Sequence, residues 1–377
     1  MTKRTLTSWP AQVAAVGTLA LAVALTGTAT PRPAPAAPVV AWTAPPATAA
    51  LATAAFAATT PDLPQPNIQA VLDAAYERYR GVRDGKNADY IPALAQVDPN
   101  LFGIALVTAD GRVYTAGNAQ TEVSIQSISK VFTMAQVLRE QGPAAIERTI
   151  GVDATGMRFN SIMSVEFAQK TGGAELNPMV NPGAITATSM VQGRSADEVW
   201  AKIIGIHNEF AGRQLNVLQD VYRSESETNQ RNQAIGALML AYGYIKSNPQ
   251  QAVDVYTRAC SIGANARDLA VMAATLAFAG RNPVTSRQVL DPGLVPEVLA
   301  VMATAGLYDD SGKWLYHTGL PAKSGVGGGI IAVAPGKFGI AVVSPPLDEA
   351  GNSVRAQRAI TEISNALGGN PYSVASR

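Results

Sequence analysis

Two predicted β-hairpins, one early and one late in the chain, place the strongest constraint on its fold. Residues 102–108 and 112–116 are β-prone runs that flank Asp110-Gly111, a dipeptide typical of tight hairpin turns. Residues 329–334 and 338–343 are apolar runs around a second turn that contains Pro and Gly. We therefore expect one antiparallel sheet in which segments from near the two ends of the domain pair with each other.

The segments between and after the hairpins indicate helices. Residues 143–306 are rich in Ala, Met and Leu in helix-length stretches, which predicts a helical lobe. The folded part begins near Asn67, a residue type that caps helices, and residues 354–367 predict a closing helix. The predicted fold is thus a mixed α/β (α+β) domain over residues 67–377, with a ligand site in the crevice between sheet and helical lobe.

The N-terminal region has a different composition from the rest of the chain. A basic start, an apolar run over residues 13–25 and the triplet Ala34-Pro35-Ala36 follow the order of a secretory signal, which we place over residues 1–37. Residues 38–66 are rich in Ala, Pro and Thr and predict a linker. We therefore expect a secreted or periplasmic protein with no stable membrane insertion after processing, with an uncleaved membrane anchor as the alternative.

Charge and composition argue against several classes of function. The 29 basic and 28 acidic residues give a net charge of +1, which provides no long-range field for nucleic acid. The single cysteine, Cys260, and the two histidines, His207 and His317, do not form a local metal-binding motif. A small molecule is therefore the expected ligand, and no metal is expected.

Ser127 and Lys130 form a Ser-x-x-Lys pattern on a segment with helical apolar spacing, residues 127–141. Positions i and i+3 of a helix share one face, so the lysine amine can reach the serine hydroxyl and remove its proton. This requires burial or a neighbouring cation to lower a lysine pKa that is normally about 10.4. A serine at the helix start also presents its backbone N–H to developing negative charge.

A second motif precedes the first strand of the late hairpin. Lys323-Ser324-Gly325 is similar to the Lys-Thr/Ser-Gly strand element of penicillin-recognising serine enzymes, whose backbone binds substrate and completes the oxyanion hole. The glycines of residues 325–329 permit close approach of the backbone to a ligand. With 20 serines and 9 lysines in the chain, a single Ser-x-x-Lys pattern can arise by chance. The prediction of a serine nucleophile therefore depends on finding both motifs, in the expected order and on the expected types of element.

Several longer segments, all in the same order, make a resemblance specific. They are residues 85–92 (Gly-Lys-Asn-Ala-Asp-Tyr-Ile-Pro), 126–130, 177–181 (Asn-Pro-Met-Val-Asn), Ser224-Glu225 with Arg231-Asn232, Tyr256 near Cys260-Ser261-Ile262, Tyr308-Asp309, 319–326 and 344–348 (Ser-Pro-Pro-Leu-Asp). With these segments the chain resembles the serine-dependent glutaminases, which share the β-lactamase/transpeptidase-like fold. The similarity extends from about residue 85 to residue 370.

The resemblance implies hydrolysis of L-glutamine to L-glutamate and ammonia. Ser127 would attack the side-chain amide with Lys130 as base, and Tyr308 or Tyr256 would assist. Water would hydrolyse the resulting γ-glutamyl ester, so neither a metal nor an organic cofactor is implied. The implied substrate-binding residues are Tyr90, Gln126, Ser127, Asn181, Glu225, Asn232, Tyr256, Tyr308 and Val326.

Each implied role suits the chemistry of its side chain. Glu225 can pair with the substrate ammonium, Asn181 and Asn232 can donate to its carboxylate, and the N–H groups of Ser127 and Val326 would hold the oxyanion. Pro182 departs from the family pattern, which usually has Ala, and removes a backbone donor there. The resemblance also implies a homodimer or homotetramer.

Three other interpretations remain open. A β-lactamase or penicillin-binding peptidase would share the fold, but no Ser-Asp-Asn is present and Gly173 stands where the deacylating glutamate is expected. An α/β-hydrolase would use Ser261 in the elbow-like run 259–263 with a later histidine such as His317, but residues 253–258 lack the pattern of the apolar strand that it needs. A non-catalytic glutamine-binding protein would keep the fold without needing Ser127.

Overall fold

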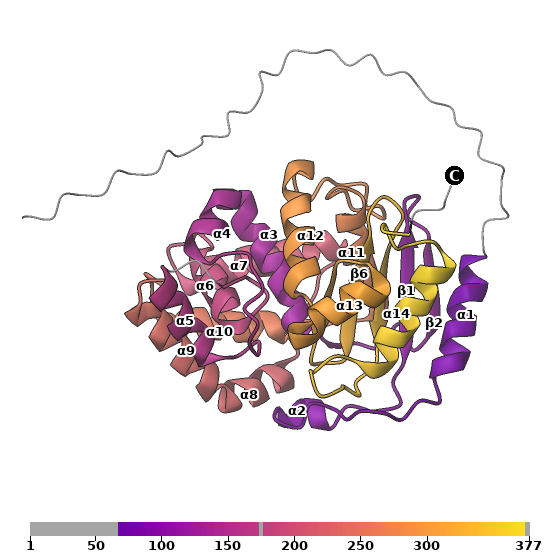
Figure 1. Ribbon diagram of the computed structural model, residues 1–377, viewed down its shortest axis with the longest axis horizontal. Helices are drawn as coiled ribbons and strands as arrows, with labels where there is room; N and C mark the ends of the chain where they lie inside the picture. Colours follow the sequence, from indigo (N-terminus) through magenta and orange to yellow (C-terminus); the bar gives the residue numbers. More distant parts are fainter. Residues whose placement is uncertain (1–66, 173–175, 374–377) are drawn as a thin grey trace, which may run out of the picture. The chain divides into compact units, whose positions relative to one another are not determined.

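The computed structural model describes residues 67–172 and 176–373. The predicted secretory segment (1–37) and linker (38–66) lie outside the described residues. The first described helix begins after Asn67, whose side chain accepts a hydrogen bond from the backbone N–H of Ala70, so the predicted cap is confirmed. Figure 1 shows the arrangement of the helices and strands.

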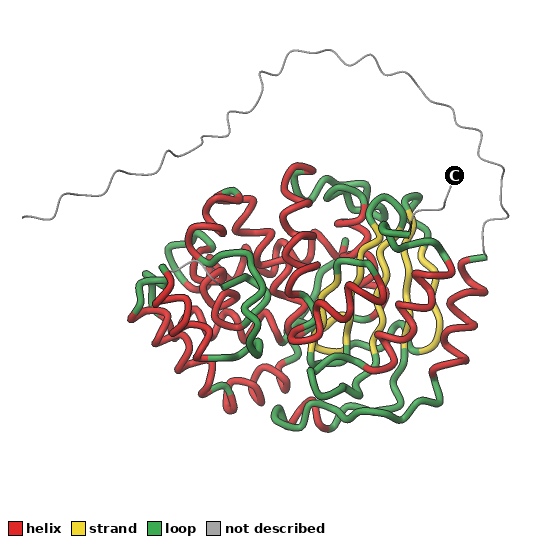
Figure 2. The backbone as a smooth tube through the Cα atoms, in the orientation of Figure 1, coloured by secondary structure: helices red, strands yellow, loops and turns green. Residues whose placement is uncertain are grey.

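Both predicted hairpins form, and they join into one sheet. The five strands are antiparallel in the order β2-β1-β7-β6-β5, so the early and late hairpins pair through β1 and β7 as expected (Figure 2). A separate two-stranded ribbon, β3-β4, lies beside the nucleophile segment. The strands are β1 (Gly103–Thr108), β2 (Val113–Gly117), β3 (Val123–Ser124), β4 (Gly263–Ala264), β5 (Ala322–Gly325), β6 (Gly329–Ala334) and β7 (Phe338–Val343).

Fourteen α-helices and three 3₁₀ turns complete the described part of the chain. The closing helix is found at its expected place as α14. The helices are α1 (Ile68–Tyr79), α2 (Pro92–Ala95), α3 (Ser129–Gln141), α4 (Pro143–Thr149), α5 (Ile162–Thr171), α6 (Asn181–Met190), α7 (Ala196–Ala211), α8 (Gln219–Thr228), α9 (Gln230–Ala241), α10 (Pro249–Cys260), α11 (Ala266–Ala277), α12 (Val295–Ala305), α13 (Ser311–Thr318) and α14 (Val354–Ala366), and the 3₁₀ turns are η1 (Gln126–Ile128), η2 (Pro292–Leu294) and η3 (Tyr308–Asp310).

The sheet is covered on both faces because alternate residues of its strands are apolar in both directions. Ile104 and Leu106 of β1 belong to a core formed with α1 and α14, whereas Ala105 and Val107 face a second core that includes α11. Gly339 of β7 lies so close to α11 that a Cβ there would collide with the backbone of Ala274. Position 339 therefore requires glycine, and α11 packs directly on the sheet.

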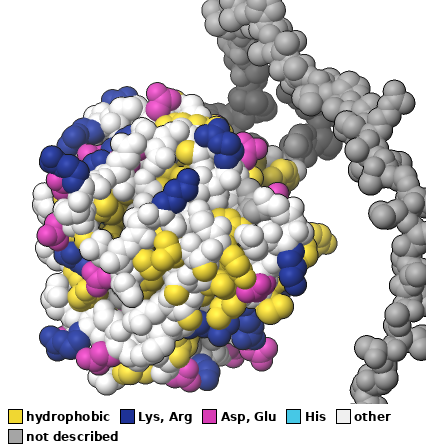
Figure 3. Space-filling view, turned by 90° about the vertical axis from the view of Figure 1, so that its left-hand side faces the viewer, with side chains coloured by type: hydrophobic (Ala, Val, Ile, Leu, Met, Phe, Trp, Pro, Cys, Tyr) yellow, Lys and Arg dark blue, Asp and Glu magenta, His cyan; other side chains and the backbone are white. Residues whose placement is uncertain are grey.

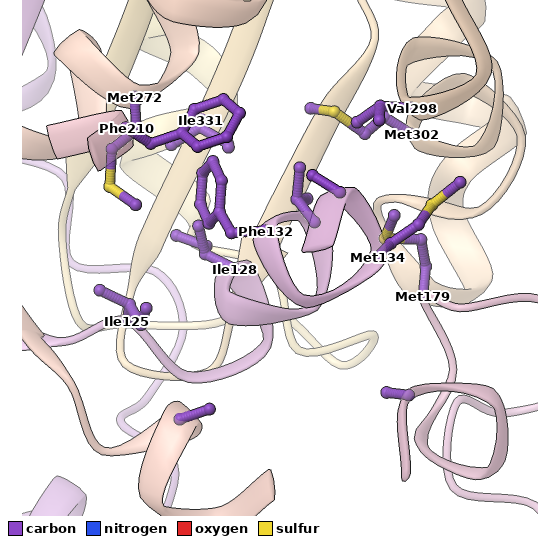
Figure 4. Close-up of a cluster of buried hydrophobic side chains, with 14 of the residues drawn as sticks. Ile125, Ile128, Phe132, Met134, Met179, Phe210, Met272, Val298, Met302 and Ile331 are labelled. Carbon is purple, nitrogen blue, oxygen red and sulfur yellow. The ribbon is translucent and has the colours of Figure 1, made fainter. Parts of the chain in front are cut away.

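The packing of α11 on the sheet differs from the predicted helical lobe. Residues 143–306 include α11, which packs against β7, β1 and β6 rather than lying apart from the sheet. Of the remaining helices of that range, α4, α6, α7 and α12 contact α3, whose residues 129–138 are all buried. Figure 4 shows Phe132 and Met134 of α3 among other buried apolar side chains. Phe132 of α3 contacts the rings of His207 and Phe210. The segment that contains Ser127 therefore leads into a buried, well-packed helix that contacts both the lobe and the sheet side of the molecule.

The surface carries no concentration of one charge on the face shown in Figure 3, where acidic and basic side chains alternate around a region of apolar ones. Among the exposed apolar side chains are Met163 and Phe167, one turn apart on α5. None of the helices over residues 67–172 and 176–373 combines the length and apolarity needed to cross a bilayer.

Candidate active site

Ser127 lies in a tight turn between strand β3 and helix α3. The sequence predicted that the helix starts at Ser127, but residues 126–128 form the 3₁₀ turn η1 and α3 begins at Ser129. Gln126, the first residue of this turn, has a φ of 49° in the left-handed region. A left-handed conformation in a non-glycine residue stores strain, and such strain gathers at functional sites. Ser127 is held here with 6% of its surface exposed.

The glycine-rich segment after β5 packs directly against this turn. A Cβ at Gly325 would collide with the carbonyl oxygen of Ile125, and one at Gly327 with that of Ser124. The glycines were expected to allow close approach to a ligand; in the structure they bring the segment against the nucleophile turn itself. This contact joins the two sequence motifs, which are almost 200 residues apart, into one site.

Two backbone N–H groups remain available next to the serine. Within the described ranges, neither the N–H of Ser127 nor that of Val326 donates a hydrogen bond to the protein backbone or to a side chain. Val326 directly follows the end of β5, in the segment whose glycines contact the turn. Unpaired N–H donors fixed by packing can stabilise negative charge on a substrate oxygen.

Lys130 is buried one turn after Ser127. Its Nζ donates to Asn181 Oδ1 at 2.6 Å and to the carbonyl oxygen of Met179 at 3.3 Å. Burial lowers the pKa of its amine to about 8, although Cys260 and Glu225 nearby act in the opposite direction. A substantial fraction of Lys130 is therefore neutral near pH 8, as a lysine base requires.

Asn181 lies between the lysine and two further predicted residues. Tyr256 OH donates to Asn181 Oδ1 at 3.2 Å, and Asn181 Nδ2 donates to Asn232 Oδ1 at 2.9 Å. Both polar ends of Asn181 are thus engaged within the protein. Its Nδ2 has two N–H bonds, and only the one to Asn232 is used within the described residues, so the expectation that Asn181 donates to a substrate carboxylate stays a prediction.

Glu225 is a buried carboxylate on α8, with 7% of its surface exposed. Its Oε2 accepts a hydrogen bond from Gln126 Nε2 at 3.1 Å. Burial raises the pKa of Glu225 to about 7, while the Gln126 hydrogen bond and the charge of Lys130 oppose this rise. The buried carboxylate is therefore costly to keep charged and would be stabilised by a bound cation.

Tyr308 covers Ser127 from the sheet side, in a second left-handed conformation with φ of 53°. Its hydroxyl donates to the carbonyl oxygen of Ser324 at 3.1 Å, and a hydrogen bond with the Ser127 side chain lowers its pKa, against the larger raising effect of burial. Lys323 Nζ lies 4.3 Å from the centre of the Tyr308 ring and donates to the carbonyl oxygens of Gly306 and Ser324. Of the two candidate tyrosines, Tyr308 contacts Ser127 and Tyr256 contacts Asn181.

Tyr90 differs from the other predicted residues because 56% of its surface is exposed. It lies near enough to Tyr308 to raise the pKa of that hydroxyl. The short helix α2 that follows is tied to α8 by a hydrogen bond from Ala93 N to Ser224 Oγ at 3.1 Å. Val326 and Tyr308 join the apolar residues of this segment in one cluster, so Tyr90 lies at the rim of the site.

Pro182 lies at a position where an α-helix tolerates proline. It occupies the first turn of α6, which begins at Asn181, where backbone N–H groups have no partner within the helix. Asn181 N instead donates to the carbonyl oxygen of Phe159 at 2.7 Å. The donor that proline removes is therefore one that the helix does not use.

Two residues of the site were not predicted from the sequence. The ring of Phe159 packs against that of Tyr308 at a tilt of 41°, with centroids 4.6 Å apart, and its centre lies 5.9 Å from Lys130 Nζ. Met179 contributes only a backbone carbonyl, so no side-chain pattern could have revealed it. A cavity of 170 Å³ borders Phe159 and Tyr308 on the side toward Thr304.

The structure excludes one alternative. Residues 253–258 form part of helix α10, not the strand that an α/β-hydrolase elbow needs, and the Ser261 hydroxyl is buried and donates to Thr257 O at 2.9 Å. Gly173, which bears on the β-lactamase alternative, lies outside the described residues. Elsewhere in the described chain, no group of three His, Cys, Asp or Glu side chains is arranged to hold a metal ion.

Comparison with known proteins places this site in a family. The family model described as Glutaminase matches residues 85–372. A glutaminase from Colwellia psychrerythraea is 49% identical over 308 residues, which are 82% of this chain and 98% of that protein. A solved structure described as a probable glutaminase, ybaS, has a TM-score of 0.79 at 45% identity and covers 81% of this chain and 98% of its own.

A third relative was solved as a covalent complex. The Bacillus subtilis glutaminase YbgJ, joined to 5-oxo-L-norleucine after reaction with 6-diazo-5-oxo-L-norleucine, superposes with a TM-score of 0.74 at 28% identity, over 81% of this chain and all of that chain. The mixed α/β architecture and its antiparallel sheet are therefore shared with solved glutaminases. The family match covers both motifs and every predicted site residue, and the chain belongs to the glutaminase family.

Proposed function

We propose that the protein hydrolyses L-glutamine to L-glutamate and ammonia through an ester on Ser127. The observation that carries this proposal is the setting of Ser127: the buried amine of Lys130, three residues later, has a lowered pKa, and the backbone N–H groups of Ser127 and Val326 donate no hydrogen bond among the described residues. The names of the relatives supply the substrate, and the covalent complex of YbgJ supports a nucleophilic mechanism.

In the acylation step, the neutral amine of Lys130 takes the hydroxyl proton of Ser127 while Oγ attacks the carbonyl carbon of the side-chain amide. The carbonyl oxygen becomes an oxyanion that accepts hydrogen bonds from the N–H groups of Ser127 and Val326. The amide nitrogen then takes the proton from Lys130 and leaves as ammonia, so the γ-glutamyl ester remains. Tyr308 would assist this proton transfer, and its hydrogen bond with the Ser127 side chain supports this role over Tyr256.

In the deacylation step, water gives a proton to Lys130 and attacks the ester carbonyl, and the proton returns to Ser127 Oγ as glutamate leaves. Glu225 would pair with the substrate ammonium, since its buried carboxylate is stabilised by a cation. Asn232 would donate to the α-carboxylate. All of these steps use groups of the protein itself.

Ammonia and glutamate should be measured together for the purified protein and for Ser127→Ala. We expect equal amounts of both products from the wild type, and a loss of about 10⁴-fold or more in the variant. Glutamine binding with no ammonia release by the wild type would support the binding-protein alternative. Equal activity in the variant would remove Ser127 from the mechanism.

We further propose the organisation expected from the sequence: an export signal over residues 1–37, a linker over 38–66 and a catalytic domain over 67–377. The support is the composition of the first 66 residues. N-terminal sequencing of protein collected outside the cytoplasm would test it, and an intact Met1 there would contradict cleavage. Assembly into a homodimer or homotetramer rests on the family resemblance, and light scattering would decide it.

A further inference from the structure

Three polar side chains form a continuous line inside the site. Lys130 Nζ donates to Asn181 Oδ1 at 2.6 Å, and Asn181 Nδ2 donates to Asn232 Oδ1 at 2.9 Å. Lys130 and Asn181 are buried, whereas Asn232 is half-buried. The line therefore runs from the base outward to the residue proposed to meet the substrate carboxylate.

The chemistry of the lysine fixes the direction of this line. An ammonium group only donates hydrogen bonds, so the oxygen of Asn181 must face Lys130 and its nitrogen must face Asn232. Asn232 must then present its own oxygen to Asn181. Its Nδ2 donates to no other described residue and is free to donate to an anion.

The same contacts orient the amine once it has lost its proton. A neutral amine has two N–H bonds and one lone pair, and Lys130 has two acceptors, Asn181 Oδ1 and the carbonyl oxygen of Met179. Two N–H bonds held by these acceptors leave the lone pair directed elsewhere, free to receive a proton. Both acceptors are uncharged, so neither stabilises the ammonium form as a carboxylate would.

We propose that Asn181 is a positioning residue that holds the amine of Lys130 in the orientation of a base and joins it, through Asn232, to the recognition of the substrate α-carboxylate. A carboxylate that accepts from Asn232 Nδ2 polarises Asn232 and Asn181 in sequence, because hydrogen bonds in a chain strengthen one another. The proposal deepens the glutaminase function and rests on it for the identity of the carboxylate. The part that concerns Lys130 stands on the hydrogen bonds alone.

The sharpest test places the same substitution at two successive points of the line. Asn181→Asp puts a carboxylate against Lys130, whereas Asn232→Asp puts one a step further away and next to the substrate carboxylate. Two readouts are needed: the pH profile of kcat/KM for L-glutamine, and the titration of the Lys130 side chain by NMR of ¹³Cε-labelled lysine. Lys130→Met assigns its signal among the nine lysines.

We expect Asn181→Asp to move the Lys130 titration and the acid limb of kcat/KM upward by about one to three pH units. Its kcat/KM at pH 7 should fall at least about tenfold and recover at high pH, which a misfolded variant would not do. Asn232→Asp should chiefly raise KM, with little movement of either midpoint. Asn181→Ala, which removes the acceptor, should lower kcat at every pH without an upward shift.

The proposal is overturned if the Lys130 signal of Asn181→Asp titrates at the wild-type midpoint, or if Asn232→Asp shifts that midpoint as far as Asn181→Asp does. The function itself has a separate point of failure. If the wild type releases no ammonia from glutamine, the proposed function falls, and the NMR titration still decides whether Asn181 controls Lys130.

Discussion

Lys130 and Lys323 are both almost fully buried, and burial lowers the pKa of both amines, yet their surroundings differ. Lys323, on strand β5, donates to two backbone carbonyls and lies against the ring of Tyr308. Lys130, on α3, donates to one carbonyl and to the Asn181 side chain, which leads to Asn232. Burial alone thus does not distinguish Lys130, proposed as the base, from Lys323; the hydrogen-bond partners of the two amines do.

The largest effects should separate these two lysines. Lys130→Met removes the base, so we expect kcat to fall by about 10²–10⁴-fold while L-glutamate still binds nearly as in the wild type. Lys323→Met removes the support of Tyr308 and of the β5 backbone, so glutamate binding should weaken along with the rate. Calorimetric titration with L-glutamate measures the difference, and equal binding by the two variants would break the comparison.

The sheet side of the site can be tested at its closest contact. In Gly325→Ala the new Cβ collides with the carbonyl oxygen of Ile125, so the glycine segment must move away from the nucleophile turn. Because this displaces the Val326 N–H, we expect kcat to fall by about 10²-fold or more. Gly336→Ala is a matched control, since a Cβ there meets no atom within 4 Å, although its φ of 71° adds local strain far from Ser127. A wild-type rate in Gly325→Ala would place the oxyanion donors elsewhere.

The buried carboxylate of Glu225 tests, as the two lysines do, how burial changes the pKa of a charged group in the site. Its pKa is raised from 4.5 to about 7, so folding takes up a proton between these values and stability falls as pH rises through that window. Glu225→Gln lacks this decline, and we expect its Tm to exceed that of the wild type at pH 8 but not at pH 4.5. Its KM should rise, since a neutral amide cannot pair with the ammonium. Thermal unfolding of both proteins as a function of pH measures this difference. Tm values that change with pH in the same way for the wild type and Glu225→Gln would contradict the prediction.

Pro182 should show the smallest effect. Proline at this first-turn position removes no helix hydrogen bond, so Pro182→Ala should retain the wild-type kcat and KM. A loss of stability of about 0.4–1 kcal/mol is expected because alanine gives the unfolded chain more freedom. Urea unfolding and steady-state kinetics measure both quantities. A changed pH profile would instead show that the departure from the family pattern alters Asn181.

The sequence alone predicted those parts of the fold that a local residue pattern determines. Strand propensity around Asp110-Gly111 and the apolar runs at 329–334 and 338–343 predicted hairpins that the sheet confirms. Ser127 and Lys130 were found because their i, i+3 spacing carries chemistry. The predicted division into a sheet and a helical lobe was less accurate. The helical spacing of residues 269–280 predicts a helix but does not indicate which surface that helix will cover.

Other features of the site lie beyond a pattern of residue types. The left-handed backbones of Gln126 and Tyr308 oppose the normal preference of these residues and exist only because the surrounding packing enforces them. Met179 acts through a carbonyl that every residue possesses. The orientation of Asn181 depends on Lys130 and Asn232, each 51 positions away in sequence, and is visible only once the chain is folded.

The place of β7 in the sheet has a consequence for the way the protein is made. This strand, residues 338–343, lies between β1 and β6 at the centre of the sheet, although it is the last strand to leave the ribosome. The edge of β1 that pairs with β7 therefore has no partner strand until some nine-tenths of the chain has been synthesised. A nascent chain stalled before residue 338 would therefore expose strand edges to chaperones, proteases or other nascent chains.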